Sequence, residues 1–521
     1  MKAHITRPDV APATVGCLRG AVYTFAVLLA AVTIGFARDE PSRSAAPKPE
    51  PKWIIHEWGT FTSLQDEAGE AIGGINTDDE PVPPFVHRLA DFLLLSPTEV
   101  PPIFFQGAPR CHPDVTMRLE TPVLYFHLPK SQRRVQGIGV EVRFRGGWLT
   151  EFYPNADADA PGLKSGDFQF GHLRSNTAST LAWKNVAVGG DALGPQTREH
   201  VWTSPRAVQA ASVQTAKGEN EKFLFYRGVA HINAPLRISR DPKAEQLVFR
   251  GQLGPELGAN KALRIRSLWL VDIQRDGKVA FRTLPPLTLE ENSNKILATI
   301  SGSFRAADFS LNNFEELKTS LHHALVADGL FHDEAQALLN TWELSYFKSA
   351  GLRVFFIVPR PWTDFYLPLK ISTPSEINRV MVGRIELVTL GQRHILQQMA
   401  RFSAAEISEQ RMQLQTNFYG KLLANQANVA ATPGSKEAEE VDAGRESLAT
   451  YGVSVPKSYQ LYLSLGRFKN ALILDEARRL PSIGLTNFVS EYGLAGYQPV
   501  AMPSDVSAET ANASSLKGSK R

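Results

Sequence analysis

The sequence predicts an α+β protein with an antiparallel β-sandwich-like body, an inserted helical hairpin and C-terminal helices. Residues 53–304 contain many short runs of period two separated by turn signals, and residues 313–348 change to a period of 3.6. Residues 352–358 and 379–388 then return to a strand pattern. We therefore expect a β-rich main domain, residues 53–390, into which the helical hairpin is inserted.

Two glycine-containing turns indicate hairpins within the β-rich part. Asp276-Gly277 lies between two alternating runs, and this dipeptide is a strong short-range hairpin signal. Gly146-Gly147 follows the alternating run 138–145 ("IGVEVRFR") in the same way. We expect a hairpin turn at each place, with a two-residue loop at Gly146-Gly147 across which the flanking strands pair.

The inserted segment predicts two amphipathic helices separated by Gly329. Leu317, Leu321 and Leu325 belong to the apolar stripe of the first helix, and Trp342 to that of the second. Asp333 and Glu334 begin the second helix, where the helix dipole favours acidic side chains. This pattern predicts a helical hairpin over residues 313–348.

The C-terminal part, residues 391–500, is expected to be helical. Residues 404–426 read as a polar helix, and residues 457–479 as a helix with a clearer apolar stripe. The last residues, 501–521, have the composition of a disordered tail.

The N-terminal segment predicts export. Basic residues precede an uncharged run, residues 20–37, and Gly35 and Ala37 are small residues at the −3 and −1 positions of a cleavage site. This is the pattern of a signal peptide over residues 1–37, followed by a proline-rich linker over residues 38–52. We therefore expect the mature protein to be located in the periplasm or at the cell surface. The alternative is an uncleaved inner-membrane anchor, and only then would the protein contact the membrane.

Composition excludes several classes of function. The net charge of +3 over 521 residues leaves no basic excess for nucleic acid. We find no nucleotide-binding loop, no serine-hydrolase elbow and no C-x-x-C motif. After cleavage one cysteine, Cys111, would remain, which cannot form an intramolecular disulfide and is expected to be an exposed loop thiol.

The first folded segment, "HEWGTFT" over residues 56–62, places a histidine beside a glutamate. The zinc-protease motif H-E-x-x-H fails because Thr60 stands at its last position. In a strand, His56 and Glu57 point to opposite faces, so the pair cannot form one site by itself. Two interpretations remain open: a structural first strand, or one residue of the pair in a catalytic pocket.

Glu151 is the main catalytic candidate. With a two-residue loop at Gly146-Gly147, Glu151 pairs with Val142 and lies on the apolar face of the hairpin. A buried carboxylate there must find a cation or a donor, or stay protonated as a general acid. The alternatives are a structural ion pair and a one-residue register shift that turns Glu151 outward.

Other residues are candidates for ligand or metal binding. His127 and His231 each end a strand, where a single histidine is more often structurally satisfied than a ligand. The alternating oxygen-bearing side chains of Asn155, Asp157 and Asp159 match only the start of a calcium loop, because the glycine and the closing glutamate of that motif are missing. Aromatic side chains could line an exposed ligand groove together with an acidic residue of the loop 359–371; these candidates are Trp58, Trp148, Trp362 and Asp364.

Four blocks carry a resemblance to other sequences: "HEWGTFT", "ETPVLYF", "LTEFYPNA" and "GLRVFFIVPRPWTDFYLPL", at residues 56–62, 120–126, 149–156 and 351–369. Together they resemble a group of uncharacterised exported bacterial proteins, over most of the chain that follows the signal peptide. The group has no assigned activity, so the resemblance implies export as one unit and implies no catalytic residue.

Two functional hypotheses follow. The first is an exported, non-catalytic protein whose β-rich body binds an envelope ligand or a protein partner, without a required cofactor. The second is an extracytoplasmic hydrolase of glycans or esters, with Glu151 as acid and His56 or Glu57 brought close to it.

Overall fold

A computed structural model describes residues 53–401 and 456–499, apart from 78–81, 90–103, 106, 161–162, 165–168, 242–244, 255–256, 258–261 and 291–294. The expected signal peptide, the linker, the helix at 404–426 and the C-terminal tail lie outside these described residues. The described residues form one compact unit. Among the described residues, none of the helices combines the length and the apolar character that a membrane crossing needs.

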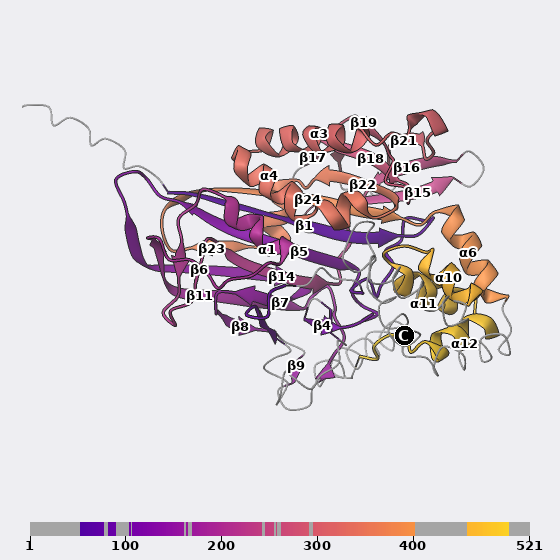
Figure 1. Cartoon of the computed structure of the whole chain (residues 1–521), viewed down its shortest axis with the longest axis horizontal. Helices are drawn as coiled ribbons and strands as arrows, with labels where there is room; N and C mark the ends of the chain where they lie inside the picture. The colour runs from indigo at the N-terminus through magenta and orange to yellow at the C-terminus, as the bar shows by residue number, and fades with distance from the viewer. Residues whose placement is uncertain are drawn as a thin grey trace, which may run out of the picture. The chain divides into compact units, whose positions relative to one another are not determined.

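The fold is α+β, as the sequence predicts, and its centre is one large sheet (Figure 1). In sheet order its main path is β13 Asn220–Glu221, β12 Val213–Gln214, β11 Ala178–Gly189, β7 Gly147–Tyr153, β14 Leu224–Ala230, β5 Met117–His127, β1 Trp53–Gln65, β24 Ser375–Leu387, β22 Gly351–Ile357, β18 Leu268–Ile273 and β19 Val279–Leu284. Off this path, four strands pair with β7 and β11 or with each other: β2 His87–Arg88, β6 Arg134–Arg145, β8 Asp157–Asp159 and β23 Leu369–Ile371.

Shorter strands form four small sheets. They are β15 Leu236–Asp241, β16 Gln246–Gly251 and β21 Ile296–Ser301; β17 Leu263–Ile265 and β20 Leu287–Leu289; β3 Phe104–Phe105 and β4 Ala108–Pro109; and β9 Leu163–Lys164 and β10 Gln169–Phe170. The predicted turn at Gly277 is confirmed, because it joins the antiparallel pair β18 and β19.

Strand β1 lies in the interior of the large sheet. It pairs with β5 in the antiparallel sense and with β24 in the parallel sense, so the sheet is mixed and not purely antiparallel as predicted. Nearly every residue of β1 is buried, because elements cover both faces of the sheet. Polar residues on β1 must therefore find hydrogen-bond or ionic partners within the protein, on neighbouring strands or in the covering elements.

The predicted helical hairpin is confirmed as α3 Asn313–Ala327, α4 His332–Thr341 and a π-helical turn η4 Glu343–Lys348. Figure 1 shows α3 and α4 side by side along β22, β24 and β1. Their apolar stripes form a core with one face of the sheet, which includes Leu317, Leu321, Trp58 and Val380. Gly329 turns the chain between the helices with a φ of 110°.

The C-terminal helices are α6 Leu390–Ala400, α10 Lys457–Leu463, α11 Lys469–Arg479 and α12 Ile483–Glu491. The prediction of one helix over 457–479 is wrong: the chain leaves helix at 464–468, where Gly466 has a φ of 87°. The predicted loop at 359–371 also contains a helix, α5 Arg360–Tyr366. The remaining short helices are α1 His200–Thr203, η2 Pro205–Ala207 and η3 Ala306–Asp308.

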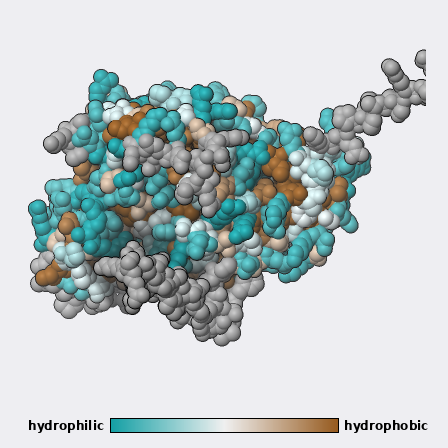
Figure 2. Space-filling view, turned by 180° about the vertical axis from the view of Figure 1, so that it is seen from behind, coloured by the Kyte–Doolittle hydropathy of each residue, from teal (hydrophilic) through white to brown (hydrophobic). Residues whose placement is uncertain are grey.

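Side chains on the opposite face of the sheet form a second core with residues of β6, β11 and β15. A third core joins the C-terminal helices to Leu64, Trp148 and Val229. The face seen in Figure 2 is mostly hydrophilic, with hydrophobic residues in separate areas.

The packing of α3 against the sheet gives a test of the fold. Leu321 is buried in the core below α3, whereas Leu311 is 62% exposed just before the helix. Leu321→Ala should lower the free energy of unfolding by about 2–5 kcal/mol, because it removes a buried side chain and leaves a cavity. Leu311→Ala should change it by less than about 0.5 kcal/mol. Urea unfolding of both variants checks this, and equal effects would contradict the packing.

Candidate functional site

His56 and Glu57 point to opposite faces of the sheet, as the strand pattern predicts. His56 faces the helical hairpin and contacts Glu334 of α4. Glu57 faces the other side, where it contacts Tyr226 and Arg379. The two residues therefore belong to two separate polar groups.

His56, His127 and Glu334 form the first group, which we call the His–His–Glu site. His56 lies opposite Tyr125 in the pairing of β1 with β5, and His127 lies opposite Ile54, so both imidazoles project from one face. The Glu334 carboxylate lies 2.6 Å from His56 Nδ1 and 2.9 Å from His127 Nε2. The ligand atoms of the three residues all lie within 4.8 Å of one another.

The α4 helix holds the Glu334 carboxylate in place. Glu334 lies in the first turn of α4, and the backbone N–H of Phe331 donates to its Oε2 at 2.8 Å. Burial acts to raise the pKa of the Glu334 carboxyl, but hydrogen bonds from His127 and His56 outweigh burial and lower the pKa. The carboxylate is therefore ionised at neutral pH, which suits it for binding a cation.

Neighbouring side chains orient the site and partly cover it. The Asn378 side-chain nitrogen lies 3.2 Å from Nε2 of His56. The Phe331 ring is 42% exposed and packs on both imidazoles, with centroid distances of 4.5 Å to His56 and 4.8 Å to His127. His127 is half-buried. The partly exposed Phe331 ring thus covers the two imidazoles of the site.

The donor set suits a transition metal. Two imidazole nitrogens and one carboxylate oxygen are ligands that zinc accepts, and three such ligands leave a coordination position open. Around a tetrahedral zinc, ligand atoms lie about 3.3 Å apart. The observed contacts of 2.6 and 2.9 Å would need to open by about half an ångström. With Nδ1 of His56 on a metal, Nε2–H would donate to the amide oxygen of Asn378, whose assignment relative to its nitrogen is interchangeable.

Glu57 belongs to a saturated structural group on the other face. It accepts hydrogen bonds from the Tyr226 hydroxyl and from Arg379 Nε, the latter at 2.5 Å. Arg379 also binds Asp364 at 2.9 Å and the Leu367 carbonyl at 2.6 Å. Glu57 is fully buried and already neutralised by Arg379, so the role proposed for it in catalysis is not supported.

Glu151 is buried, as predicted, but the predicted hairpin is wrong. Strand β6 pairs with β11, and β7 pairs with β14, so Glu151 lies opposite Arg227 instead of Val142. Arg88 Nε and Arg227 Nη1 contact its two carboxylate oxygens at 3.1 and 3.2 Å. Gly146 does reverse the chain with a φ of 76°, but its amide donates to the Thr177 carbonyl. The turn signal was local, whereas packing across the sheet selected the strand partners.

Glu151 and the "HEWGTFT" segment do not form one site. Two strands, β14 and β5, separate β7 from β1, which is about 14 Å at the usual strand spacing. Glu151 is held between two arginines, so a role as a protonated general acid is not supported.

The three candidate tryptophans do not line an exposed groove. Trp58, Trp148 and Trp362 are all buried, each within a different hydrophobic core. Asp364 is half exposed on α5, where Arg379 and Arg360 bind its carboxylate. The prediction of an aromatic groove is wrong because packing of the cores takes up the indole rings. Cys111, expected to be exposed, is also buried.

Residues 155–159, the candidate calcium ligands after β7, do not form a calcium-binding loop, because Asp157 and Asp159 lie on a strand. Asp157 and Asp159 are exposed on β8, which pairs with β11. Asp157 contacts Lys184 at 2.7 Å, and the Asn155 backbone donates to Glu219. Among the described residues, the group with the ligand spacing of a metal site is the His–His–Glu site and not this run.

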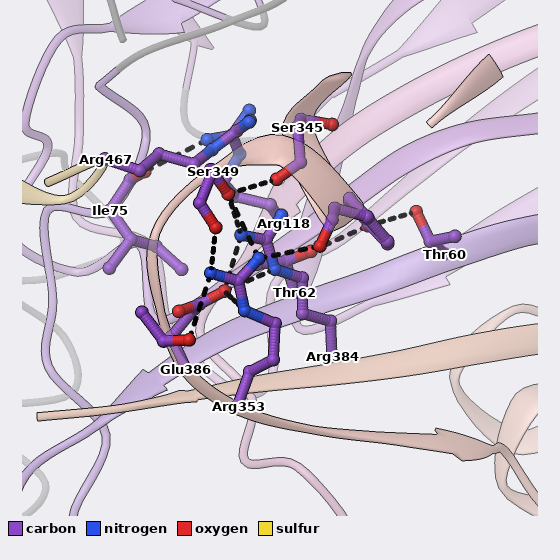
Figure 3. Close-up of polar contacts among 12 residues, drawn as sticks. Thr60, Thr62, Ile75, Arg118, Ser345, Ser349, Arg353, Arg384, Glu386 and Arg467 are labelled. Carbon is purple, nitrogen blue, oxygen red and sulfur yellow. Dashed lines mark hydrogen bonds and ion pairs between the residues drawn. The ribbon is translucent and has the colours of Figure 1, made fainter. Parts of the chain in front are cut away.

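A second buried polar group, which we call the arginine cluster, lies on the hairpin face further along β1 (Figure 3). It contains four buried arginines and two buried glutamates: Arg118, Arg353, Arg384, Arg467, Glu120 and Glu386. Glu386 contacts Arg384 at 2.5 Å and Arg353 at 3.1 Å. Arg384 and Glu386 lie two residues apart on β24, so their side chains share one face of the sheet.

Glu120 is the centre of the arginine cluster. Its carboxylate contacts Arg118 at 2.9 Å and Arg467 at 3.5 Å. It also accepts hydrogen bonds from Tyr346 at 2.5 Å and from Thr62 at 2.7 Å. These contacts connect β5, β1, η4 and the segment between α10 and α11, so we assign the cluster a structural role.

Sequence reasoning missed most of these residues. His127 was noted only as a single histidine, and Glu334 only as a helix-dipole residue. Arg118, Arg353 and Arg467 were not identified. His56 and His127 could have been recognised as neighbours only if the pairing register of β1 with β5 were known, and the sequence alone does not give that register.

Comparisons with known proteins do not identify a family. No protein-family model and no curated protein matches the sequence. The chain is similar to the Mu homology domain of Fcho1 from Danio rerio with a bound Eps15 peptide, at 9% identity and a TM-score of 0.22, covering 65% of this chain and 94% of that one. It is also similar to the yeast delta-COP-I mu-homology domain complexed with a Dsl1 WxWxV peptide, at 7% identity and a TM-score of 0.21, covering 65% and 96%. TM-scores this low carry no argument about this protein.

The structural role of Glu120 can be tested by removing its charge. Glu120→Gln keeps the shape but leaves buried arginines without their counter-charge, so the free energy of unfolding should fall by about 3–5 kcal/mol. Glu141→Gln is a matched control, because its pair with Lys370 is exposed. The control should cost less than about 1 kcal/mol. Equal losses in the two variants, measured by urea unfolding, would contradict a central role for Glu120.

The same carboxylate should make stability depend on pH. Burial acts to raise the pKa of Glu120, but the charges of Arg118 and Arg467 outweigh it and lower the pKa from 4.5 to about 2. A lowered pKa stabilises the fold above about pH 4.5, and this stabilisation disappears as the pH falls toward 2. The difference in unfolding free energy between wild type and Glu120→Gln should therefore shrink by about 3 kcal/mol over that range. A difference that stays constant from pH 6 to pH 2.5 would refute this.

Proposed function

We propose that this protein is an exported metal-binding protein that holds a divalent transition-metal ion of the zinc class at the His–His–Glu site. The observation that carries the proposal is the meeting of His56, His127 and Glu334 within 4.8 Å from three separate elements. Export rests on the N-terminal sequence pattern. This proposal retains the first hypothesis from the sequence, an exported binding protein with a β-sandwich-like body. It differs in the binding site, which is a metal site instead of an aromatic ligand groove.

Three features of the site support metal binding over a purely structural role. The ligands come from β1, β5 and α4, so a bound ion would connect the sheet to the helical hairpin. Glu334 is buried, and its side-chain partners are two imidazoles, which bind transition metals when neutral, and not the arginines that bind the other buried glutamates. Asn378 and the Phe331 amide already hold His56 and Glu334 from outside, as second-sphere partners of metal ligands do.

The hydrolase hypothesis loses the acid that motivated it, because Glu151 is paired with two arginines. The proposal therefore concerns binding and assigns no reaction.

Zinc binding to the full chain tests the proposal. After removal of metal with a chelator, isothermal titration should show one zinc ion per chain, and calcium should not compete, because imidazole favours zinc. His127→Ala and Glu334→Gln should each weaken zinc binding more than about 100-fold, beyond the 10–100-fold effect of outer partners such as Asn378. His172→Ala, which alters a half-exposed histidine paired with Asp114, should leave binding unchanged.

Two results would contradict the proposal. One is the absence of stoichiometric zinc binding by the folded wild type. The other is equal zinc affinity in wild type and His127→Ala, since the variant lacks one of the three proposed ligands. In either case, the three residues form a hydrogen-bonded structural group.

A further inference from the structure

A pocket of about 290 Å³ lies beside the His–His–Glu site. The pocket lies next to the N-terminal half of β24. Strand β22 pairs only with residues 382–387 of β24, so it does not cover this half. Residues 357–361, 378–380 and 262–264 line the pocket, together with Arg266 and Asp328. Its volume is near the lower end of the range of about 300–1,000 Å³ for small-molecule sites, so it would hold a small ligand.

Asn378 connects this pocket to the His–His–Glu site. It lines the pocket, and its side-chain nitrogen lies 3.2 Å from Nε2 of His56. The α3–α4 turn covers both places: Asp328 lines the pocket, and Phe331 packs on the imidazoles. Gly329 of this turn lies beside Asn378, since an added Cβ would be in van der Waals contact with its amide nitrogen at 3.4 Å. A molecule in the pocket would therefore be one side chain away from the proposed metal.

The pocket wall carries more positive than negative charge. Arg264 is exposed and has no ion pair among the described residues, and Arg266 is 3.7 Å from Asp328. Arg360 contacts Asp364 at 3.3 Å, but Arg379 binds the same carboxylate at 2.9 Å. Asp328 is thus the acidic group that remains to balance Arg264 and Arg266. Two arginines on the wall of one pocket favour an anion, since a guanidinium binds a carboxylate through charge-assisted hydrogen bonds.

The rest of the wall is apolar. Leu263, Ile357, Val358 and Val380 are buried side chains that contribute to it, and two prolines, Pro359 and Pro361, complete it. Apolar walls with a few polar groups are typical of sites that bind organic molecules and not free inorganic ions.

We propose that this pocket binds a small organic carboxylate, with its apolar body against Leu263, Val358 and Val380 and its carboxylate on Arg264 and Arg266. The inference concerns a different ligand from the metal and does not require that the metal site be correct. If both hold, the protein presents a carboxylate ligand and a metal ion side by side.

Benzoate and benzyl alcohol are suitable probes, because they share an apolar ring and differ in charge. Titration of the full chain should show that benzoate binds at least about tenfold more tightly than benzyl alcohol, the effect of one charge-assisted contact. The double variant Arg264→Gln/Arg266→Gln should lose about tenfold in benzoate affinity or more. Both arginines are exposed, so these changes should leave the fold intact.

Arg305→Gln is the matched control, since Arg305 is an exposed arginine that lines a different hollow near Phe304. It should bind benzoate as the wild type does. Three results would overturn the proposal: no benzoate binding, equal affinity for the two probes, or unchanged benzoate affinity in the double variant.

The same titration with His127→Ala separates this inference from the metal proposal. If His127→Ala loses zinc and keeps benzoate, the carboxylate pocket stands by itself. If wild type binds no zinc and still binds benzoate through Arg264 and Arg266, the metal proposal fails and this one survives.

Discussion

Burial of β1 on both faces is the constraint on which the polar architecture of this protein depends. A central strand that carries His56, Glu57, Thr60 and Thr62 cannot leave these groups without partners, because unpaired buried polar groups are costly. Each one has a partner: His56 is bound by Glu334 of α4, and Glu57 by Arg379 of the neighbouring strand β24. Thr60 and Thr62 are bound by Glu120 of β5 and by Tyr346 of η4. The helical hairpin, β24 and β5 are thereby fixed relative to β1 by polar contacts as well as by apolar packing.

The buried polar groups differ in what they can do. Glu57 and Glu151 are paired with arginines, and a carboxylate neutralised in this way has little capacity for a further cation. The arginine cluster binds its two glutamates in the same manner and connects distant elements. Glu334 is different because its partners are histidines, which can give up a proton and offer a lone pair. For this reason the His–His–Glu site, and not the more highly charged groups, is the functional candidate.

The turn between α3 and α4 brings the two proposed ligand sites together. Glu334 and Phe331 belong to the metal site, and Asp328 belongs to the carboxylate pocket. The inserted hairpin thus does more than cover the sheet: the start of α4 supplies Glu334 to the proposed metal site, and the α3–α4 turn supplies Asp328 to the wall of the neighbouring pocket.

The sequence alone determined the α+β class, the helical hairpin at 313–348 and the opposite orientations of His56 and Glu57. These follow from local periodicity, which sets the side-chain directions within one element. The tertiary structure decided which elements become neighbours. The partner of β7 is β14 and not β6, so Glu151 meets Arg227, and Glu334 reaches His56 from 278 residues away. Such contacts depend on how whole faces pack, and no short stretch of sequence contains that information.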